Sequence, residues 1–415
     1  AAARGPQRGR AAVMAFAGHG GARVAAEGWN AALAALARLL DRRSPLDRRG
    51  EAAEALLRHC GQLTAVRDFA RAVHALGRGR RWQGALTLLG DMNQRSLGPC
   101  LVSHTSAMSA CASASAWQHA VLAFGALRGA GVPLDVITCS TAISACEKGR
   151  QWIHALGLFH EMWSLGPAPD VVAYNATVSA CGWGQEWARA LWLVKDLRHR
   201  GLSPTVVTCS ALVSACEKGQ QWQRALWFFG DMAREGLALD GIACGAAVAA
   251  CEKGRQWQHC LALLQRAAAL DLRLEVIAYN STISACARCG EWQRALSLFQ
   301  DMQLAVAHPD VISFDAAIAA YKAGQQWAGA LQLVAEMRRR LLRPTAVTFS
   351  VAVSACAQAE CWAAALQLWE ELPAQSVEPN AMTYTAVLGA CERGHLWERS
   401  IGLLAEAQRS RLELD

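Results

Sequence analysis

Tryptophan recurs with a period of 35 residues along most of this 415-residue chain. No insertion or deletion interrupts the series, which consists of Trp82, Trp117, Trp152, Trp187, Trp222, Trp257, Trp292, Trp327, Trp362 and Trp397. A fixed period of about 20 to 50 residues marks a stacked-repeat protein, in which each repeat buries its apolar face against its neighbours. We therefore expect one extended body whose functional surface runs along the stack.

The composition favours helices. Hydrophobic residues make up 53% of the chain, alanine is the commonest of them, and only 11 residues are proline. No apolar run reaches the roughly 18 residues of a membrane span, so none is predicted. The net charge of +7 is a mild excess that favours an anionic partner.

The 16 cysteines do not predict disulfides or a metal site. Eight occupy one repeat position, within an Ala-Cys pair: Cys111, Cys146, Cys181, Cys216, Cys251, Cys286, Cys356 and Cys391. A buried thiol there would act as a compact hydrophobe. Cys286 and Cys289 form the only CxxC spacing, which is too little for a metal site, so neither metal nor cofactor is expected. Free thiols favour a reducing compartment.

Each repeat predicts two amphipathic helices. Two apolar faces with helical spacing occur between residues 136 and 170: Val136, Cys139, Ile143 and Cys146, then Trp152, Ala155, Leu156, Phe159 and Met162. Gly149 lies between them, and we expect it to end the first helix in the left-handed conformation. The tryptophan is predicted to be core, filling the gap between hairpins. His119, His154 and His259 follow it by two residues and predict a solvated face, not metal ligands.

A 35-residue hairpin of this composition resembles the P-type pentatricopeptide repeat. The closest copy has Tyr279-Asn280 near its start, Ala295-Leu296 in its second helix and Pro309-Asp310 at its end. The resemblance covers residues 66–415 and predicts ten tandem repeats, which begin at residues 66, 101, 136, 171, 206, 241, 276, 311, 346 and 381. The tetratricopeptide repeat, a protein-binding module, has a period of about 34 and would drift out of register. The implied fold is all-α, a right-handed superhelical solenoid of stacked helix-turn-helix hairpins.

What the resemblance implies is binding of single-stranded RNA, one base per repeat, through positions 2, 5 and 35. Position 2 would clamp the base through Val102, Ile137, Val172, Val207, Ile242, Ile277, Ile312 and Val347. Position 5 would read it through Thr105, Ser140, Asn175, Ser210, Asn280, Asp315, Ser350 and Thr385. The paired position 35 carries Asp135, Asp170, Thr205, Asp240, Asp310, Thr345, Asn380 and Asp415.

Both polar columns have a structural alternative. Asp, Asn and Thr at position 35 also serve as helix N-caps. Position 5 is harder to explain in that way, because Ser, Thr and Asn inside a helix cost stability relative to Ala. They also vary between repeats, whereas the tryptophan never does. The two columns together favour base reading over capping alone.

The side-chain pairs predict a bound sequence. An Asp at position 35 only accepts hydrogen bonds, so it suits the N–H groups of uracil or guanine. By the family's code, a short hydroxyl at position 5 leaves room for a purine, and Asn reaches a pyrimidine. The prediction is 5′-NGGYGNUNAG-3′, read from the N- to the C-terminus. Three pairs depart from the pattern and give no base: Ala70/Cys100, Gly245/Glu275 and Asp315/Thr345.

Basic residues recur at position 13, near the end of the first helix, and would contact phosphates: Arg78, Lys148, Lys218, Lys253, Arg288 and Arg393. A solvated helix end that complements the macrodipole explains them equally well. If all six contact phosphates, log affinity should fall against log salt with a slope of about −4, at about −0.7 for each contact. A titration of RNA binding between low and moderate salt measures this slope. A slope near zero would show that these residues make no electrostatic contact with phosphates.

The chain ends are atypical. Residues 26–65 predict a degenerate capping repeat. Residues 1–25 form a basic Ala/Gly/Arg-rich tail, either a transit-peptide remnant or a disordered RNA-contacting arm. Because the family is largely organellar, the resemblance implies a mitochondrion or plastid, and otherwise a reducing intracellular compartment. Trp397, Ile401 and Leu404 present an uncovered apolar stripe, which suggests truncation or a protein partner.

Two functions of different class follow. The first is sequence-selective RNA binding in organelle RNA processing, stability or translation. The second is a protein-binding helical-repeat scaffold, favoured by the departures from the code in repeats one, six and eight and by the modest charge. The zinc-deaminase elements that some family members append are not found. We therefore expect a protein that is not an enzyme.

Overall fold

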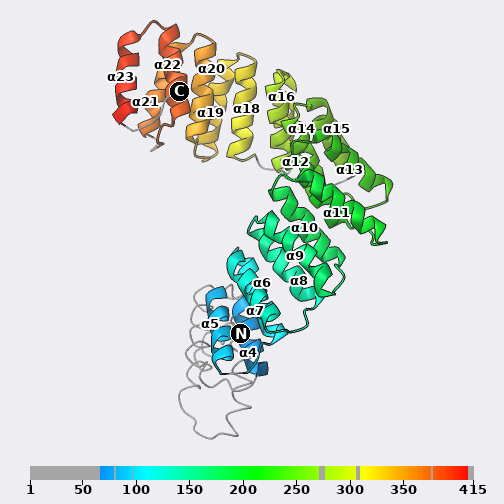
Figure 1. Cartoon of the computed structure of the whole chain (residues 1–415). Helices are drawn as coiled ribbons and strands as arrows, with labels where there is room; N and C mark the ends of the chain where they lie inside the picture. The colour runs from blue at the N-terminus through cyan, green and yellow to red at the C-terminus, as the bar shows by residue number, and fades with distance from the viewer. Residues whose placement is uncertain are drawn as a thin grey trace, which may run out of the picture. The chain divides into compact units, whose positions relative to one another are not determined.

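The computed structural model describes residues 66–78, 81–95, 97–270, 276–304, 309–374 and 377–409. The predicted tail (1–25), the predicted capping repeat (26–65) and Asp415 lie outside these ranges, as does the side chain of Arg78. The described residues are helical and contain no strand (Figure 1). The predicted all-α fold is confirmed.

The described residues form ten hairpins. Their first helices are α4 (Val66–Arg78), α6 (Leu101–Ser113), α8 (Val136–Lys148), α10 (Val171–Trp183), α12 (Val206–Lys218), α14 (Gly241–Lys253), α16 (Val276–Arg288), α18 (Val311–Ala323), α20 (Ala346–Gln358) and α22 (Ala381–Arg393). Their second helices are α5 (Trp82–Gln94), α7 (Trp117–Gly129), α9 (Trp152–Leu165), α11 (Trp187–His199), α13 (Trp222–Arg234), α15 (Trp257–Ala269), α17 (Trp292–Leu304), α19 (Trp327–Arg339), α21 (Trp362–Ala374) and α23 (Trp397–Arg409). Each second helix begins at one of the periodic tryptophans.

The hairpins belong to two compact units, Ala1–Thr208 and Cys209–Asp415. In the first unit, α4, α6, α8 and α10 pack in succession. In the second, α14, α16, α18, α20 and α22 do the same. Second helices such as α7 and α17 pack against their own first helix and against that of the next hairpin. Each unit is therefore a stack in which the first helices form a continuous row (Figure 1).

The Ala-Cys position lies in the core, as predicted. All eight cysteines of this position are buried and free. Burial raises the pKa of Cys146 to about 11 and that of Cys181 to about 12. Because these thiols stay protonated, they act as compact apolar side chains between helices.

Glycine at position 14 has a different role from the predicted one. Gly149 has a φ of −78°, and the left-handed residue is the next one, Arg150, at 56°. The predicted left-handed cap at Gly149 is therefore wrong. A Cβ on Gly149 would lie 2.4 Å from Cδ1 of Trp117, in the preceding hairpin. At Gly149 a side chain would collide with that indole, so the indole would have to move.

The periodic tryptophans lie between hairpins, but most are half-buried and not fully core. A His or Arg two positions after the next tryptophan covers Trp82, Trp117, Trp152, Trp222 and Trp257. His119 stacks on Trp82 with ring centroids 4.8 Å apart, and the Arg189 guanidinium carbon lies 4.8 Å from the centroid of Trp152. The histidines are exposed, as predicted. They also have a packing role that the sequence analysis missed.

The last described helix, α23, carries an exposed apolar stripe. Trp397 is 67% exposed and Ile401 is 59% exposed, as the sequence predicted. A partner for this stripe stays a prediction. None of the described helices is long and apolar enough to cross a membrane.

Candidate functional site

A column of exposed aliphatic side chains recurs on the first helices of both compact units. The second residue of these helices is Val or Ile and is 51–66% exposed in Val102, Ile137, Val172, Val207, Ile242, Ile277, Ile312 and Val347. Single exposed apolar residues are ordinary, but the same position is exposed in eight hairpins. Such a regular apolar column indicates a contact surface for a ligand with apolar faces.

Side chains at position 35 cap the next first helix. Each accepts a hydrogen bond of 2.8–3.3 Å from the backbone N–H three residues later, in Asp135, Asp170, Thr205, Asp240, Asp310, Thr345 and Asn380. The capping interpretation is confirmed for these seven. A carboxylate has two oxygens with about four lone-pair sites, so capping leaves acceptor capacity for another partner. Capping and base reading are therefore compatible.

Three predicted pairs of positions 5 and 35 meet across adjacent hairpins. The position-5 side chain donates to position 35 in Ser210–Asp240 (3.1 Å), Asn280–Asp310 (3.1 Å) and Asn175–Thr205 (3.4 Å). Elsewhere the position-5 hydroxyl donates to a carbonyl of its own helix, in Ser140, Ser350 and Thr385. The structure thus brings some of the predicted pairs together and leaves others apart.

Repeat seven contains an unsatisfied acceptor. Asn280 is only 6% exposed, and its Oδ1 has no hydrogen-bond partner among the described residues. A buried polar atom left without a partner costs about 1–3 kcal/mol. Burial raises the pKa of Asp310, but hydrogen bonds from Ser313 and Asn280 lower it by more, so this pKa lies below its usual value. This pair therefore combines an ionised carboxylate with an amide oxygen that lacks a donor.

The third residue of the following hairpin also contacts position 5, which the sequence analysis missed. The hydroxyl pairs with the position-5 side chain in Thr208–Asn175 (2.6 Å), Thr348–Asp315 (2.5 Å) and Thr138–Thr105 (2.9 Å). All three of these threonines at position 3 are fully buried. A buried hydroxyl needs a partner. The recurrence of Thr or Ser at this position, in six of the ten repeats, was the signal that could have revealed the contact.

Two basic residues of position 13 form ion pairs between hairpins. Lys253 Nζ lies 2.5 Å from Glu217 Oε1, and Arg288 pairs with Glu252. Each acid is at position 12 of the preceding repeat. The basic side chains remain 42% and 49% exposed, so these pairs contribute only about 0–1 kcal/mol. Both cations therefore remain accessible to another anion.

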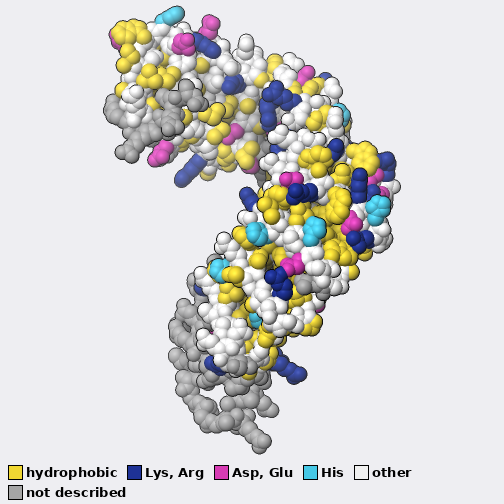
Figure 2. All heavy atoms as spheres, viewed as in Figure 1, with side chains coloured by type: hydrophobic (Ala, Val, Ile, Leu, Met, Phe, Trp, Pro, Cys, Tyr) yellow, Lys and Arg dark blue, Asp and Glu magenta, His cyan; other side chains and the backbone are white. Residues whose placement is uncertain are grey.

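The other position-13 residues have mixed surroundings. Arg393 donates to the carbonyl of Ala357, and Lys148 is exposed. Lys218 is half-buried. On the face seen in Figure 2, acidic side chains lie among the Lys and Arg side chains. Phosphate contact by position 13 stays a prediction.

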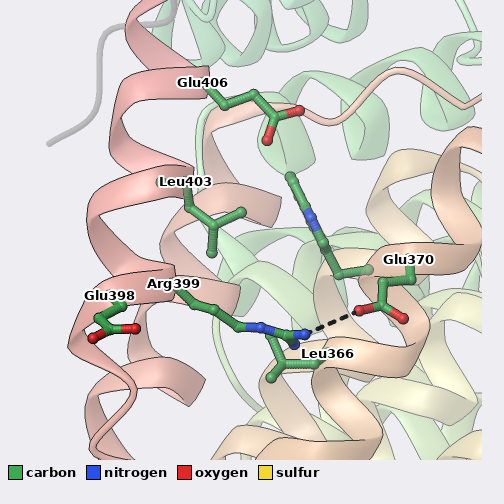
Figure 3. Close-up of a pocket in the computed structure, with 8 residues that line it drawn as sticks. Leu366, Glu370, Glu398, Arg399, Leu403 and Glu406 are labelled. Atoms are coloured by element: carbon green, nitrogen blue, oxygen red, sulfur yellow. Dashed lines mark ion pairs between the residues drawn. The ribbon is translucent and has the colours of Figure 1, made fainter.

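A cleft between α21 and α23 is a different kind of surface. It has a volume of about 530 Å³ and is lined by second-helix residues, among them Glu370, Glu398, Arg399 and Glu406 (Figure 3). Arg399 pairs with Glu370 at 3.6 Å. Three carboxylates around one guanidinium disfavour an anion. The first-helix surface is therefore the better candidate.

Two family models match this sequence. The model of the PPR repeat matches residues 137–167, 207–237 and 277–305, and the model of the pentatricopeptide repeat domain matches residues 297–359 and 332–393. The chain is a pentatricopeptide-repeat protein. The first three matches all begin at the second residue of a first helix, so the family's register agrees with the helices described above.

Solved structures of pentatricopeptide-repeat proteins share this fold. PPR10 in complex with an 18-nucleotide psaJ RNA element has a TM-score of 0.78 and 18% identity, over 99% of this chain and 60% of that chain. PPR10 from maize has a TM-score of 0.56 and 15% identity, over 94% of this chain and 64% of that chain. This pentatricopeptide-repeat chain thus spans about 60% of the length of PPR10. No curated protein matches its sequence.

Asp315→Asn is expected to stabilise this pentatricopeptide-repeat protein at neutral pH. Burial raises the pKa of Asp315, against the hydrogen bond from Thr348. The folded state therefore binds the proton more tightly than the unfolded state, whose Asp pKa is about 3.9. The free-energy cost of keeping the buried Asp315 ionised is fully present when the pH is above the pKa of Asp315 in the folded state. It disappears as the pH falls to the pKa of the unfolded state. We expect a gain in stability at neutral pH that shrinks as the pH falls.

Urea denaturation at several pH values measures this gain. The matched control is Asp301→Asn, at an exposed aspartate of α17, which should leave the stability at neutral pH nearly unchanged. A variant Asp315→Asn no more stable than the native chain at neutral pH would contradict the prediction.

Proposed function

We propose that this chain binds single-stranded RNA, one base per repeat, through positions 2, 5 and 35. The observation that carries the proposal is the exposed aliphatic column at position 2, from Val102 to Val347. Seven of the eight members lie three residues before a polar position-5 side chain on the same helix, and Ile242 precedes Gly245. A nucleobase has apolar faces and polar edges, so alternating aliphatic and hydrogen-bonding side chains suit a row of unpaired bases.

The likeness in fold to PPR10, whose complex contains an 18-nucleotide RNA, supports the proposal. At 18% identity this likeness concerns the fold, and the base assignments depend on this chain's own side chains. The pairing of Asn280 with Asp310 and of Ser210 with Asp240 supports them, because each pair already joins two successive repeats. A base bound there would meet both residues of the pair.

The proposed role is in organelle RNA processing, RNA stability or translation, within a mitochondrion or plastid. Occupation of one nucleotide per repeat would shield the RNA from nucleases, prevent its folding or recruit an enzyme. The chain itself is proposed to bind without catalysis.

An in vitro selection from a random single-stranded RNA pool at moderate salt tests the proposal. We expect enrichment of 5′-NGGYGNUNAG-3′, with G, U, A and G at the positions of repeats two, seven, nine and ten. The matched variant replaces three exposed residues, Ile242, Ile277 and Ile312, by Asp. Because these side chains are 61–66% exposed, the variant should fold and lose RNA binding. Weak binding without sequence preference would contradict the proposal and favour the protein-binding scaffold.

A further inference from the structure

Repeats four and eight share one arrangement of three side chains. The three side chains are those at positions 5 and 35 and at position 3 of the next repeat. In repeat four they are Asn175, Thr205 and Thr208, and in repeat eight they are Asp315, Thr345 and Thr348. The position-3 hydroxyl donates to Oδ1 of position 5 at 2.6 and 2.5 Å, respectively. The two threonine hydroxyls of each repeat are 3.0 and 3.2 Å apart. The repeats differ chiefly in the amide or carboxylate at position 5.

The direction of the hydrogen bonds in repeat eight follows from counting protons. Thr348 has one hydroxyl proton and donates it to Asp315, because an ionised carboxylate has none to give. The bond between the two threonine hydroxyls must then be donated by Thr345. Thr345 Oγ1 also accepts from the backbone N–H of Thr348. Repeat eight therefore offers a ligand only acceptors: the second oxygen of Asp315 and the remaining lone pair of Thr345.

Counting protons in the same way shows that repeat four offers a ligand a hydrogen-bond donor at position 5. Thr208 donates to Oδ1 of Asn175, so Thr205 must donate to Thr208. The Asn175 amide nitrogen has two protons, one of which is directed at Thr205 Oγ1 at 3.4 Å. The other N–H is available to a ligand. Asn175 therefore presents a donor where Asp315 presents an acceptor.

We propose that repeat eight binds cytosine and recognises its exocyclic amino group through Asp315. This inference depends on the proposed RNA-binding function. Asp and Asn have nearly the same size, so Asp315 leaves the space that Asn175 leaves for a pyrimidine. Carboxylates accept hydrogen bonds from cytosine N4. The cytosine amino group has two N–H protons for the two acceptors, Asp315 and Thr345, whereas uracil offers a single N–H between two carbonyl oxygens.

Thr348 is the positioning residue of this site. By holding one oxygen of Asp315, it determines which oxygen remains for the base. Thr208 has the same role for Asn175 in repeat four. The threonine does not itself touch the base, so its effect must pass through position 5.

A base analogue tests the recognised atom directly. The probes are the predicted ten-nucleotide RNA with cytosine at its eighth position, and the same RNA with pyrimidin-2-one there, which lacks the amino group. The native chain should bind the analogue about tenfold more weakly, as expected for one lost base contact. Asp315→Asn, which presents an N–H, should bind the two RNAs with similar affinity. An equal loss in both proteins, or no loss in the native chain, would overturn the proposal.

The positioning role is tested with the same two RNAs. Thr348→Ala should reduce the discrimination between them, and Thr348→Ser, which keeps the hydroxyl, should restore it. The control Thr383→Ala removes a position-3 hydroxyl in repeat ten, where it bonds to Asn380, and should leave the discrimination unchanged. Thermal melting checks that each variant folds. Full discrimination by folded Thr348→Ala would show that Thr348 has no positioning role.

The selection separates failure of this inference from failure of the proposed function. Enrichment of the predicted bases at repeats two, seven and ten, with uracil, a purine or no preference at repeat eight, would overturn the cytosine assignment alone. Selection of no motif at all would overturn the RNA-binding function and this inference with it.

Discussion

Asn280→Thr is expected to change the seventh base of the selected RNA from U to G. Asn280 donates to Asp310 at 3.1 Å and occupies the space beside that carboxylate. The shorter Thr would make room for a purine and leave Asp310 to accept from N1–H and N2–H of guanine. A good side-chain pair discriminates between bases by about 1–3 kcal/mol, so the ratio of U to G binding should change about tenfold or more. Competition between two RNAs that differ only at this base measures the change.

Asn93→Thr is the matched control for this substitution. Asn93 is an exposed residue of the second helix α5, far in sequence from any position 5 or 35 of repeat seven. The Asn93→Thr variant should leave the base preferences of all repeats unchanged. The Asn280→Thr variant should leave the base preferences of repeats two and ten unchanged. RNA binding by Asn280→Thr with its U preference intact would refute the assignment of repeat seven.

Gly184→Val is expected to destabilise the first compact unit by about 1–3 kcal/mol, the usual cost of an overpacked contact. A Cβ on Gly184 would lie 2.3 Å from Cδ1 of Trp152. Gly184 has a φ of −81°, which any residue adopts, so the loss comes from the collision and not from the backbone. Displacing the indole also separates Trp152 from Arg189, whose guanidinium carbon is 4.8 Å from the ring centroid. The midpoint of urea denaturation measures the effect.

Gly157→Val is the control, in the same compact unit. Gly157 is an exposed residue within α9, and no atom of the described structure lies within 4 Å of an added Cβ. Stability should stay the same or rise by a few tenths of a kcal/mol, since Val has a higher helix propensity than Gly. Ala114, Cys289 and Ala359 occupy position 14 in repeats two, seven and nine, so the bulkier β-branched valine is a sharper test than alanine. An equal loss in both variants would show that the tryptophan contact does not explain the glycine.

The helices of this protein follow from local patterns in its sequence. The apolar spacing that starts at Trp152 predicts a helix, and α9 begins at that residue. The Ala-Cys pairs predict a buried position, and Cys146 is fully buried. Both predictions succeed because helical periodicity within a single segment already determines which side chains share a face.

The candidate site was only partly predictable. The exposed aliphatic side chain of Ile277 and the cap formed by Asp310 were predicted from their positions in the repeat, and the structure shows both features. The bond from Thr348 to Asp315 was not predicted, because it joins residues 33 positions apart in different hairpins. The reason why glycine occupies position 149 was not predicted either, because its neighbour Trp117 is in the preceding hairpin.

By itself, the sequence determined the helical hairpins, their period and the columns of residues that recur in them, because each depends on spacing within one repeat. Only the tertiary structure decided which side chains meet between repeats. It joined Thr208 to Asn175 and placed the tryptophan against glycine at position 14. Such contacts depend on the distance and direction between side chains of successive hairpins, and no periodicity within a helix specifies these.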